Sequence, residues 1–246
     1  MKAKMNKIRE ILLIPRIRYS NFFQNITKSF SYNGREDIIN KAMEFVGNSY
    51  VKGDYLEFGV YIGKTFVPAY YLAQKHLHKN MKFYAFDSFE GFPCVEENEY
   101  DWKEGDYSCS VSNFKKILIN NKVNLKKVHI ITGWFNKVLN NKTKEKIPLK
   151  KASVIYIDCD LYKSTVPVLN FITDYLQNGT ILIFDDWFCF KGNPNKGEQK
   201  AFREWLKKNP KIEATEYYKF GWHGNSFIIT IKNAKITQKL KGRNKQ

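Results

Sequence analysis

Two carboxylates stand two residues apart at the end of an apolar run. The stretch "VIYIDCDLYKST", residues 154–165, places Asp158 and Asp160 directly after residues typical of a buried strand. Because successive strand side chains point to opposite faces, Asp158 and Asp160 are expected to project to the same side. Two negatively charged carboxylates at such a short distance repel each other. The pair therefore predicts a cation, a shared proton or substrate donors between the carboxylates.

The elements that must position this pair follow a regular pattern of strands and helices. Buried strands are expected within residues 54–63, 81–87, 127–134, 152–160 and 179–186, and a closing strand pair at 213–220 and 226–232. Helices are expected at 36–49, 65–78, 111–122, 136–145, 164–177 and 197–208, with Ser164 capping the fifth. This alternation predicts an α/β fold: a mostly parallel twisted sheet, helices on both faces and an antiparallel C-terminal strand.

Polar residues or glycines follow every one of the first five strands. In parallel sheets, ligands bind outside the carboxyl ends of the strands. The residues at these ends are Glu57, Asp87, Gly133 with Trp134, Asp158 with Asp160, and Asp185 with Asp186. We therefore expect the functional site at this edge.

The first two strand ends suggest what the site binds. "LEFGVYIGKT", residues 56–65, is a strand-to-helix turn in which Gly59 and Gly63 would let a ligand approach the backbone. Glu57 suits an ammonium group better than a pyrophosphate, and Asp87 can accept hydrogen bonds from both ribose hydroxyls. Together they indicate a nucleoside bearing an amino acid, which is S-adenosylmethionine. Trp134 and Phe135 either flank its adenine or are ordinary core aromatics.

The remaining acids indicate a metal ion. Asp158, Asp160, Asp185 and Asp186 offer a set of hard oxygen ligands, which favours Mg²⁺, Mn²⁺ or Ca²⁺ over zinc. A cation would also relieve the repulsion between the paired aspartates. His223 lies before the last strand and either takes part in proton transfer or is structural. Glu198 is expected to favour the dipole of its helix rather than to bind a ligand.

Composition limits the class of protein. The 246 residues, 43% hydrophobic, suit a single large α/β domain, and no apolar run is long enough to cross a membrane or to act as a secretory signal. The four cysteines lack zinc or disulfide spacing, so a cytoplasmic protein with reduced thiols is expected. The net charge of +17 is concentrated in residues 1–19, 115–151 and 232–246. This pattern favours a solvated lysine-rich surface over nucleic-acid contact.

Several motifs, taken in order, resemble those of the macrocin O-methyltransferase (TylF-like) family. They are "GDYLEFGVYIGKTF", "YAFDSFEGFP", "GWF", "IDCDLYKST", "GTILIFDDWF" and "GEQKAFREW", spread over roughly residues 50–230. The resemblance implies a Rossmann-like methyltransferase fold, S-adenosylmethionine as methyl donor, a divalent metal and a sugar or other polyol hydroxyl as acceptor. Lys64 departs from the family pattern, where many members have a second glycine, and so leaves the finer cofactor contacts in doubt.

The resemblance also implies roles for individual residues. Asp158, Asp185 and Asp186 match its metal ligands, for Mg²⁺ or Mn²⁺, and Asp160 matches its general base, with His223 as a further catalytic candidate. The predicted cofactor-binding residues are Glu57, Gly59, Val60, Tyr61, Gly63, Asp87, Ser88, Gly133, Trp134 and Asp158.

The sequence thus predicts a metal-dependent O-methyltransferase acting on a nucleotide-linked or surface-glycan sugar, with a homodimer possible and no nucleic-acid partner. Its expected organisation is a basic N-terminal segment and helical lid at 1–49, the methyltransferase domain at 50–232 and a basic tail at 233–246. A nucleic-acid methyltransferase or RNA-binding module remains the alternative, and a phosphoryl-transfer enzyme could use the same acids.

Overall fold

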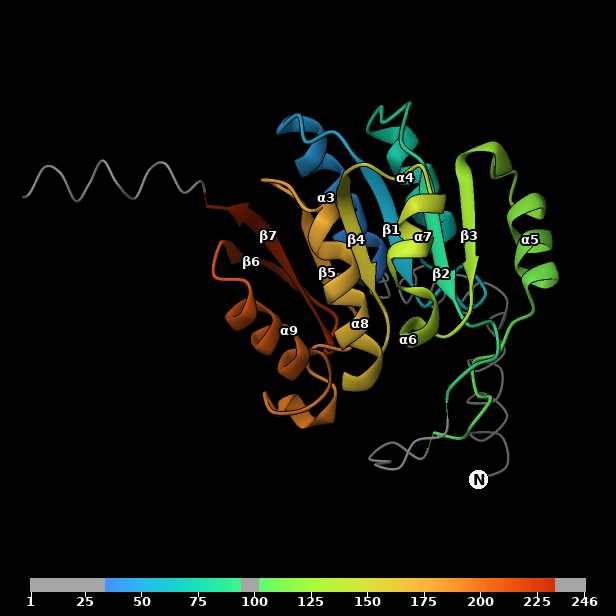
Figure 1. Cartoon of the computed structure of the whole chain (residues 1–246). Helices are drawn as coiled ribbons and strands as arrows, with labels where there is room; N and C mark the ends of the chain where they lie inside the picture. Colours follow the sequence, from blue (N-terminus) through green and yellow to red (C-terminus); the bar gives the residue numbers. More distant parts are fainter. Residues whose placement is uncertain (1–33, 94–101, 233–246) are drawn as a thin grey trace, which may run out of the picture. The chain divides into compact units, whose positions relative to one another are not determined.

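One sheet forms the centre of the protein. The computed structural model describes residues 34–93 and 102–232, and within them seven strands pair in the order β3-β2-β1-β4-β5-β7-β6 (Figure 1). The strands are β1 (Asp54–Phe58), β2 (Phe83–Asp87), β3 (Val128–Thr132), β4 (Ala152–Ile157), β5 (Ile181–Phe184), β6 (Ile212–Phe220) and β7 (Gly224–Ile231). β1 to β5 pair in parallel, whereas β7 is antiparallel to both β5 and β6. The predicted mostly parallel sheet with an antiparallel C-terminal strand is confirmed.

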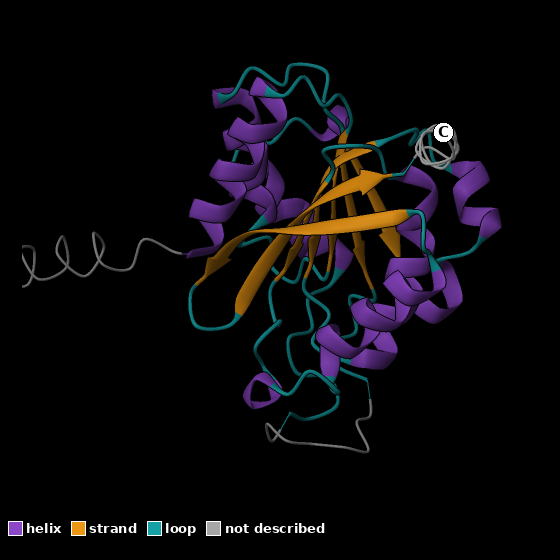
Figure 2. Cartoon of the chain, turned by 90° about the vertical axis from the view of Figure 1, so that its left-hand side faces the viewer, coloured by secondary structure: helices purple, strands orange, loops and turns teal. Residues whose placement is uncertain are grey.

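Helices cover both faces of the sheet, as Figure 2 shows with the strands seen nearly along their edges. They are α3 (Gly34–Asn48), α4 (Phe66–Lys75), α5 (Val111–Asn120), α6 (Phe135–Val138), α7 (Asn141–Lys146), α8 (Tyr162–Ile172) and α9 (Gly197–Lys208). Buried residues of α3, α4 and α5 pack with one set of alternating strand residues, and those of α8 and α9 pack with the other. Among the described residues, no helix is long and apolar enough to cross a membrane.

Helix α3 is part of the core. Its buried residues Ile38, Ile39, Ala42, Met43 and Val46 repeat at helical spacing and belong to the same apolar cluster as strands β1, β2 and β4. The chain from Arg35 onward groups with the sheet as one compact unit, although the sequence placed the domain limit near residue 50. The expected N-terminal basic segment before α3 and the basic tail from residue 233 lie outside the described residues.

Two helices differ from their predicted limits. The helix expected at 136–145 is divided into α6 and α7, because the Asn140 side chain accepts a hydrogen bond from the Thr143 amide at 3.1 Å and starts a new helix. The predicted Ser164 cap of α8 is wrong. That helix starts at Tyr162, and the Ser164 amide donates to the Leu161 carbonyl oxygen at 3.0 Å within the first turn.

The ends of β1 and β4 pass very close to each other at the carboxyl edge. The Asp158 amide donates to the Phe58 carbonyl oxygen at 2.9 Å. Gly59 has φ +86°, and a Cβ atom there would lie 2.0 Å from the Asp158 carbonyl oxygen. Only glycine fits this position, because a side chain would both strain the backbone and collide with the neighbouring strand. The glycine turn is thereby held against the acidic end of β4.

Candidate active site

Three carboxylates converge at the carboxyl edge. One oxygen from each of Asp158, Asp160 and Asp186 lies within 4.8 Å of the other two. β4 ends at Ile157, so Asp158 and Asp160 lie in the loop that follows, and Asp160 has φ +53°. Aspartate tolerates this left-handed conformation better than most residues. A turn of the loop, rather than the strand pleat, therefore brings the two paired aspartates together.

This acidic cluster places unfavourable charge in a poorly solvated position. Burial, followed by the neighbouring carboxylates, raises the pKa of Asp158, Asp160 and Asp186 well above the ordinary value. The Oδ2 atom of Asp186 is buried without a hydrogen-bond partner among the described residues. Buried carboxylate oxygens without a donor are costly, so the cluster calls for a positive partner.

A divalent cation suits these three oxygens chemically. Mg²⁺ binds oxygen at about 2.1 Å, so ligands on opposite sides of the ion lie about 4.2 Å apart, and Ca²⁺ spans a somewhat wider distance. The separations of up to 4.8 Å in the cluster are close to these values, and rotation of the aspartate side chains can close the difference. The all-oxygen donor set also matches the ligand preference of both ions.

Asp185, which the sequence placed among the metal ligands, has other partners. Its fully buried carboxylate accepts hydrogen bonds from Arg35 of α3, with the Nε atom at 2.8 Å from Oδ1 and 3.0 Å from Oδ2, and forms an ion pair with the Arg35 Nη2 atom. The Tyr156 hydroxyl donates to Oδ1 at 2.5 Å. Asp185 would have to exchange the Arg35 contact for a cation in order to act as a ligand, so that role stays a prediction.

His223 lies beside the same residue. It belongs to the turn between β6 and β7, which reaches the carboxyl edge because the start of β7 pairs with the end of β5. Its Nδ1 atom is 2.5 Å from the Asp185 carbonyl oxygen and 3.7 Å from Oδ1 of that residue. A neutral His223 would donate from Nδ1 to the carbonyl oxygen, leaving Nε2 as its free acceptor. Its catalytic role stays a prediction.

Asp87 connects the glycine turn to the end of β2. Its Oδ2 atom accepts from the amides of Val60 at 2.8 Å and Tyr61 at 3.0 Å, and its Oδ1 atom accepts from the Phe89 amide at 2.7 Å. A carboxylate has about four acceptor positions, so Asp87 keeps capacity for a further donor such as a ribose hydroxyl. The predicted cofactor residues Gly59, Val60, Tyr61 and Asp87 are thus brought together in one turn.

Glu57 has a different environment from the one its predicted role requires. It is fully buried and accepts hydrogen bonds from the Tyr55 hydroxyl at 2.5 Å and the Thr65 hydroxyl at 2.6 Å. Burial raises the pKa of Glu57 to about 8, although both hydrogen bonds act in the opposite direction. In this arrangement Glu57 binds Thr65, which follows the glycine turn, and so helps to fix the turn. Its direct contact with an ammonium group stays a prediction.

The raised pKa of Glu57 predicts a pH-dependent stability. Between its ordinary value of 4.5 and about 8, Glu57 is protonated in the folded chain and ionised in the unfolded one. Folding then binds a proton, so the free energy of unfolding falls as pH rises, by at most about 1.4 kcal/mol per pH unit. Glu57→Gln keeps the shape of the side chain and cannot ionise, so urea unfolding at pH 5.5 and 7.5 should show this dependence reduced in the variant.

The matched control is Glu90→Gln, which removes an exposed carboxylate near the same edge. This variant should keep the pH dependence of the unmodified protein. An identical dependence in Glu57→Gln and the unmodified protein would contradict the raised pKa.

The other predicted cofactor residues are spread over four strand ends: Gly63 in the glycine turn, Ser88 after β2, Gly133 and Trp134 after β3, and Asp158 in the acidic cluster, and their contact with a donor stays a prediction. Gly63 has φ +73°, and its amide donates to the Val60 carbonyl oxygen at 2.6 Å. The Ser88 hydroxyl accepts from the Glu90 amide at 3.1 Å and shapes the loop after β2. The Gly133 amide donates to the Asp87 carbonyl oxygen at 2.9 Å, and Trp134 caps α6. Phe135 packs edge-on against Phe58 at 5.9 Å, which favours the core alternative for that ring.

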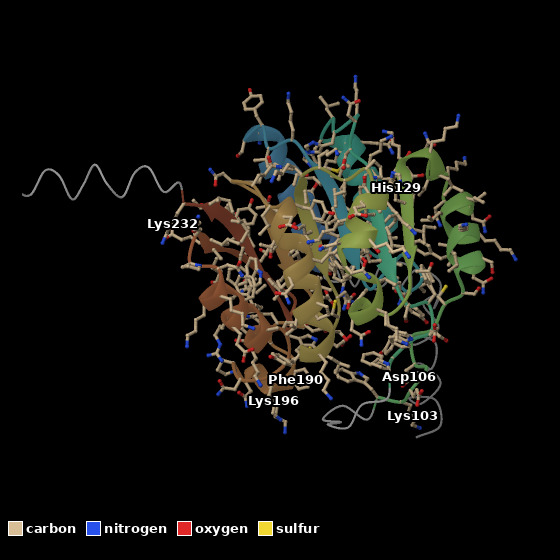
Figure 3. The ribbon with its side chains drawn as sticks, in the orientation of Figure 1. Lys103, Asp106, His129, Phe190, Lys196 and Lys232 are labelled. Carbon is tan, nitrogen blue, oxygen red and sulfur yellow. The ribbon has the colours of Figure 1, made fainter. Side chains whose placement is uncertain are left out.

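Sequence reasoning missed several members of the site. Arg35 and Tyr156 bind Asp185, Glu198 accepts from the Asp186 amide, and the Cys189 thiol donates to Asp186 Oδ1 at 3.4 Å. Tyr156 stands two residues before Asp158, so strand alternation could have indicated it. Arg35 is 150 residues away from its partner and has no local signal. Figure 3 labels Phe190 and Lys196, which lie between β5 and α9, at the end of the molecule where the carboxyl ends of the parallel strands lie.

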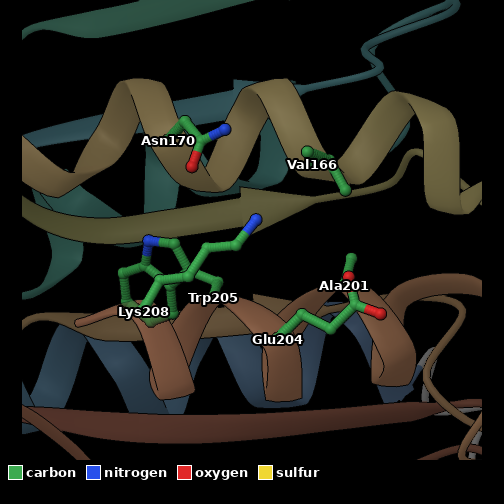
Figure 4. A pocket seen from close by; sticks show the side chains of 6 residues that line it. All are labelled: Val166, Asn170, Ala201, Glu204, Trp205 and Lys208. Atoms are coloured by element: carbon green, nitrogen blue, oxygen red, sulfur yellow. The ribbon is translucent and has the colours of Figure 1, made fainter. Parts of the chain in front are cut away.

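A pocket between α8 and α9 lies apart from these residues. Figure 4 shows its lining by Val166, Asn170, Ala201, Glu204, Trp205 and Lys208. Its volume of about 10 Å³ holds no more than one water molecule. None of the lining residues belongs to the acidic cluster or the glycine turn, so this pocket is not the site.

The sequence that forms this site matches a known protein family. The model of the macrocin-O-methyltransferase (TylF) family matches residues 26–216, which is more than half of the chain. The chain belongs to this family. The match includes the glycine turn, Asp87, and all four aspartates at the ends of β4 and β5.

The individual relatives have low sequence identity to this chain. The chain is 25% identical over 163 residues to demethyldecarbamoylnovobiocin O-methyltransferase of Streptomyces niveus, covering 62% of this chain and 59% of the relative. It is 26% identical over 147 residues to mycinamicin III 3''-O-methyltransferase of Micromonospora griseorubida, covering 56% of each. The aligned region therefore spans less than two thirds of the length of these relatives.

Solved structures of the calicheamicin methyltransferase CalS11 share the fold. One has a TM-score of 0.67 at 20% identity, covering 92% of this chain and 91% of that one. Its apo structure, described as a TDP-rhamnose 3'-O-methyltransferase, has a TM-score of 0.58 at 21% identity, covering 88% of this chain and 87% of that one. At this level of identity the likeness establishes the Rossmann-like methyltransferase fold.

Proposed function

We propose that the protein transfers the methyl group of S-adenosylmethionine to a hydroxyl of a sugar, with a divalent cation bound at the acidic cluster. The observation that carries this proposal is the convergence of Asp158, Asp160 and Asp186 beside the glycine turn. Membership in the macrocin-O-methyltransferase family supports the reaction type. The description of CalS11 as an enzyme of TDP-rhamnose supports a nucleotide-linked sugar as the acceptor.

The donor would bind at the ends of β1 and β2. Asp87 has acceptor capacity left for a ribose hydroxyl, and Gly59 and Gly63 keep side chains away from the ligand. Lys64 follows Gly63 in the turn, so the contacts there differ from those of relatives with glycine. Most of these residues follow different strands from the acidic cluster, so donor and cation would bind at neighbouring places, with Asp158 predicted to contact both.

The acceptor side would depend on the aspartates. Asp158 and Asp186 are the proposed ligands, supported by the proximity of their oxygens, and a bound Mg²⁺ or Mn²⁺ would lower the pKa of the acceptor hydroxyl. Asp160, whose oxygen also belongs to the cluster, is assigned here as the base that would accept the hydroxyl proton rather than as a ligand. The acceptor oxygen forms the new bond to the methyl carbon, and the carbon–sulfur bond breaks with its electron pair remaining on sulfur.

A panel of acceptors tests this proposal. With radiolabelled S-adenosylmethionine and Mg²⁺, we expect label to enter a nucleoside-diphosphate sugar and not RNA. The reason is that the lysines of residues 115–151 are spread over three helices and the adjoining segments, where Lys144, for example, pairs with Asp174 at 2.6 Å. Label in RNA that is lost steeply with added salt, with sugars inert, would support the nucleic-acid alternative. Absence of S-adenosylmethionine binding would contradict the whole proposal.

A further inference from the structure

Glu198, which the sequence predicted only to favour the dipole of its helix, is buried beside the acidic cluster. It lies in the first turn of α9 and is 1% exposed. Its Oε2 atom accepts a hydrogen bond from the Asp186 amide at 3.0 Å. Its Oε1 atom is buried and has no hydrogen-bond partner among the described residues.

Asp186, which donates its amide to Glu198, also has one buried carboxylate oxygen without a hydrogen-bond donor among the described residues. One of its oxygens accepts from the Cys189 thiol at 3.4 Å, whereas Oδ2 is buried and unpartnered within the described part of the chain. Two connected acids therefore each present one unsatisfied oxygen, in residues that are 8% and 1% exposed. Such a pair is strongly unfavourable unless something positive occupies the space beside it.

The backbone holds Glu198 in this position. Gly197, the first residue of α9, has φ +50°, and a Cβ atom there would lie 2.8 Å from the Phe190 ring and 3.3 Å from the Asp160 carbonyl oxygen. The start of α9 is thus packed directly against the loop that carries Asp160. Glu198 is therefore held beside the cluster by two contacts: the hydrogen bond to the Asp186 amide and the packing of Gly197 against the Asp160 carbonyl oxygen.

We propose that Glu198 is a positioning residue for the cation site: it fixes the Asp186 backbone through its hydrogen bond and presents a further carboxylate oxygen beside the three clustered aspartates. This inference rests on the proposed divalent cation. Because Glu198 is absent from the group whose oxygens lie within 4.8 Å of one another, it acts through Asp186 and through its charge, not as a member of that group.

The test separates the hydrogen bond from the charge. Glu198→Gln keeps an oxygen that can accept from the Asp186 amide and removes the charge, and Glu198→Ala removes both. Mn²⁺ binding, measured directly by the resonance signal of the free ion, should weaken about 10-fold in Glu198→Gln and further in Glu198→Ala. The control is Glu204→Gln on the same helix, where the carboxylate accepts from the Tyr162 hydroxyl at 2.6 Å. Its Mn²⁺ affinity should stay within about two-fold.

Thermal unfolding provides a readout that a purely structural role would not give. Without metal, Glu198→Gln should unfold at the same temperature as the unmodified protein or higher, because glutamine keeps the size of the side chain and the acceptor for the Asp186 amide. With saturating Mn²⁺, the stabilisation should be smaller than in the unmodified protein. A residue that only supports the fold would lower the metal-free unfolding temperature instead.

Each outcome has a distinct meaning. Unmodified protein that fails to bind Mn²⁺ would contradict the proposed cation site itself. Unmodified protein that binds Mn²⁺, together with unchanged affinity in Glu198→Gln, would contradict the role of Glu198 alone. A lowered metal-free unfolding temperature in Glu198→Gln would also overturn it, even if Glu198→Ala fails to fold.

Discussion

Replacing Asp160 with asparagine is expected to lower turnover by about 10² or more while leaving Mn²⁺ and S-adenosylmethionine affinity within a few-fold. Asparagine keeps the size of the side chain but cannot accept the hydroxyl proton, and a lost general base has about this effect. Steady-state methyl transfer at saturating metal would measure the change. Asp174→Asn is the matched control, because the Asp174 carboxylate is exposed and pairs with Lys144 at the surface. It should keep full turnover.

Asp158→Asn should show the opposite pattern. A neutral amide replaces a charged ligand, so the metal concentration for half-activity should rise, whereas turnover at saturating metal should fall less than in Asp160→Asn. The two variants are interpreted together, because removal of either carboxylate also shifts the pKa of the other. If Asp160→Asn abolishes metal binding and Asp158→Asn does not, Asp160 is the third ligand of the cluster and the assigned roles are reversed.

Removing divalent metal is expected to abolish methyl transfer without releasing the methyl donor. Apart from Asp158, the proposed donor contacts belong to the ends of β1, β2 and β3, whereas the acidic cluster follows β4 and β5. Calorimetric affinity for S-adenosylmethionine should therefore stay within about two-fold in excess chelator. Methyl transfer should fall to background and return when Mg²⁺ is added above the chelator concentration.

The control for this experiment is metal analysis of the chelated sample. Full methyl transfer in protein shown to be free of divalent metal would contradict the cation proposal, and the aspartates would then require another explanation for their close approach. Loss of donor affinity in chelator would instead indicate that the cation and the donor share ligands.

The sheet could be predicted from the sequence because its signals are local. Each of the five parallel strands is a short apolar run, and each run ends in the polar residues or glycines that now line one edge. The rule that ligands bind at the carboxyl ends of strands then located the candidate site. Asp158 and Asp160 were expected to share a side through strand alternation. They meet instead because Asp160 turns the loop with a positive φ.

The remaining partners could not be predicted because they depend on packing between distant segments. Glu198 lies in the first turn of its helix, as expected, but the sequence could not show that the start of α9 would be buried against Asp160. Arg35 binds Asp185 across 150 residues. Glu57 has the correct type for an ammonium ligand, yet Tyr55 and Thr65 already satisfy its two oxygens.

The place of β7 in the sheet has a consequence for the design of shortened chains. The family match ends at residue 216, within β6, whereas β7 begins at Gly224 and lies between β5 and β6. A fragment cut at the end of the family match would lose the buried residues Phe227 and Ile229, together with His223, and would leave β5 as an unpaired edge. The region that carries the family motifs is therefore smaller than the region that folds, and a fragment boundary belongs after Ile231.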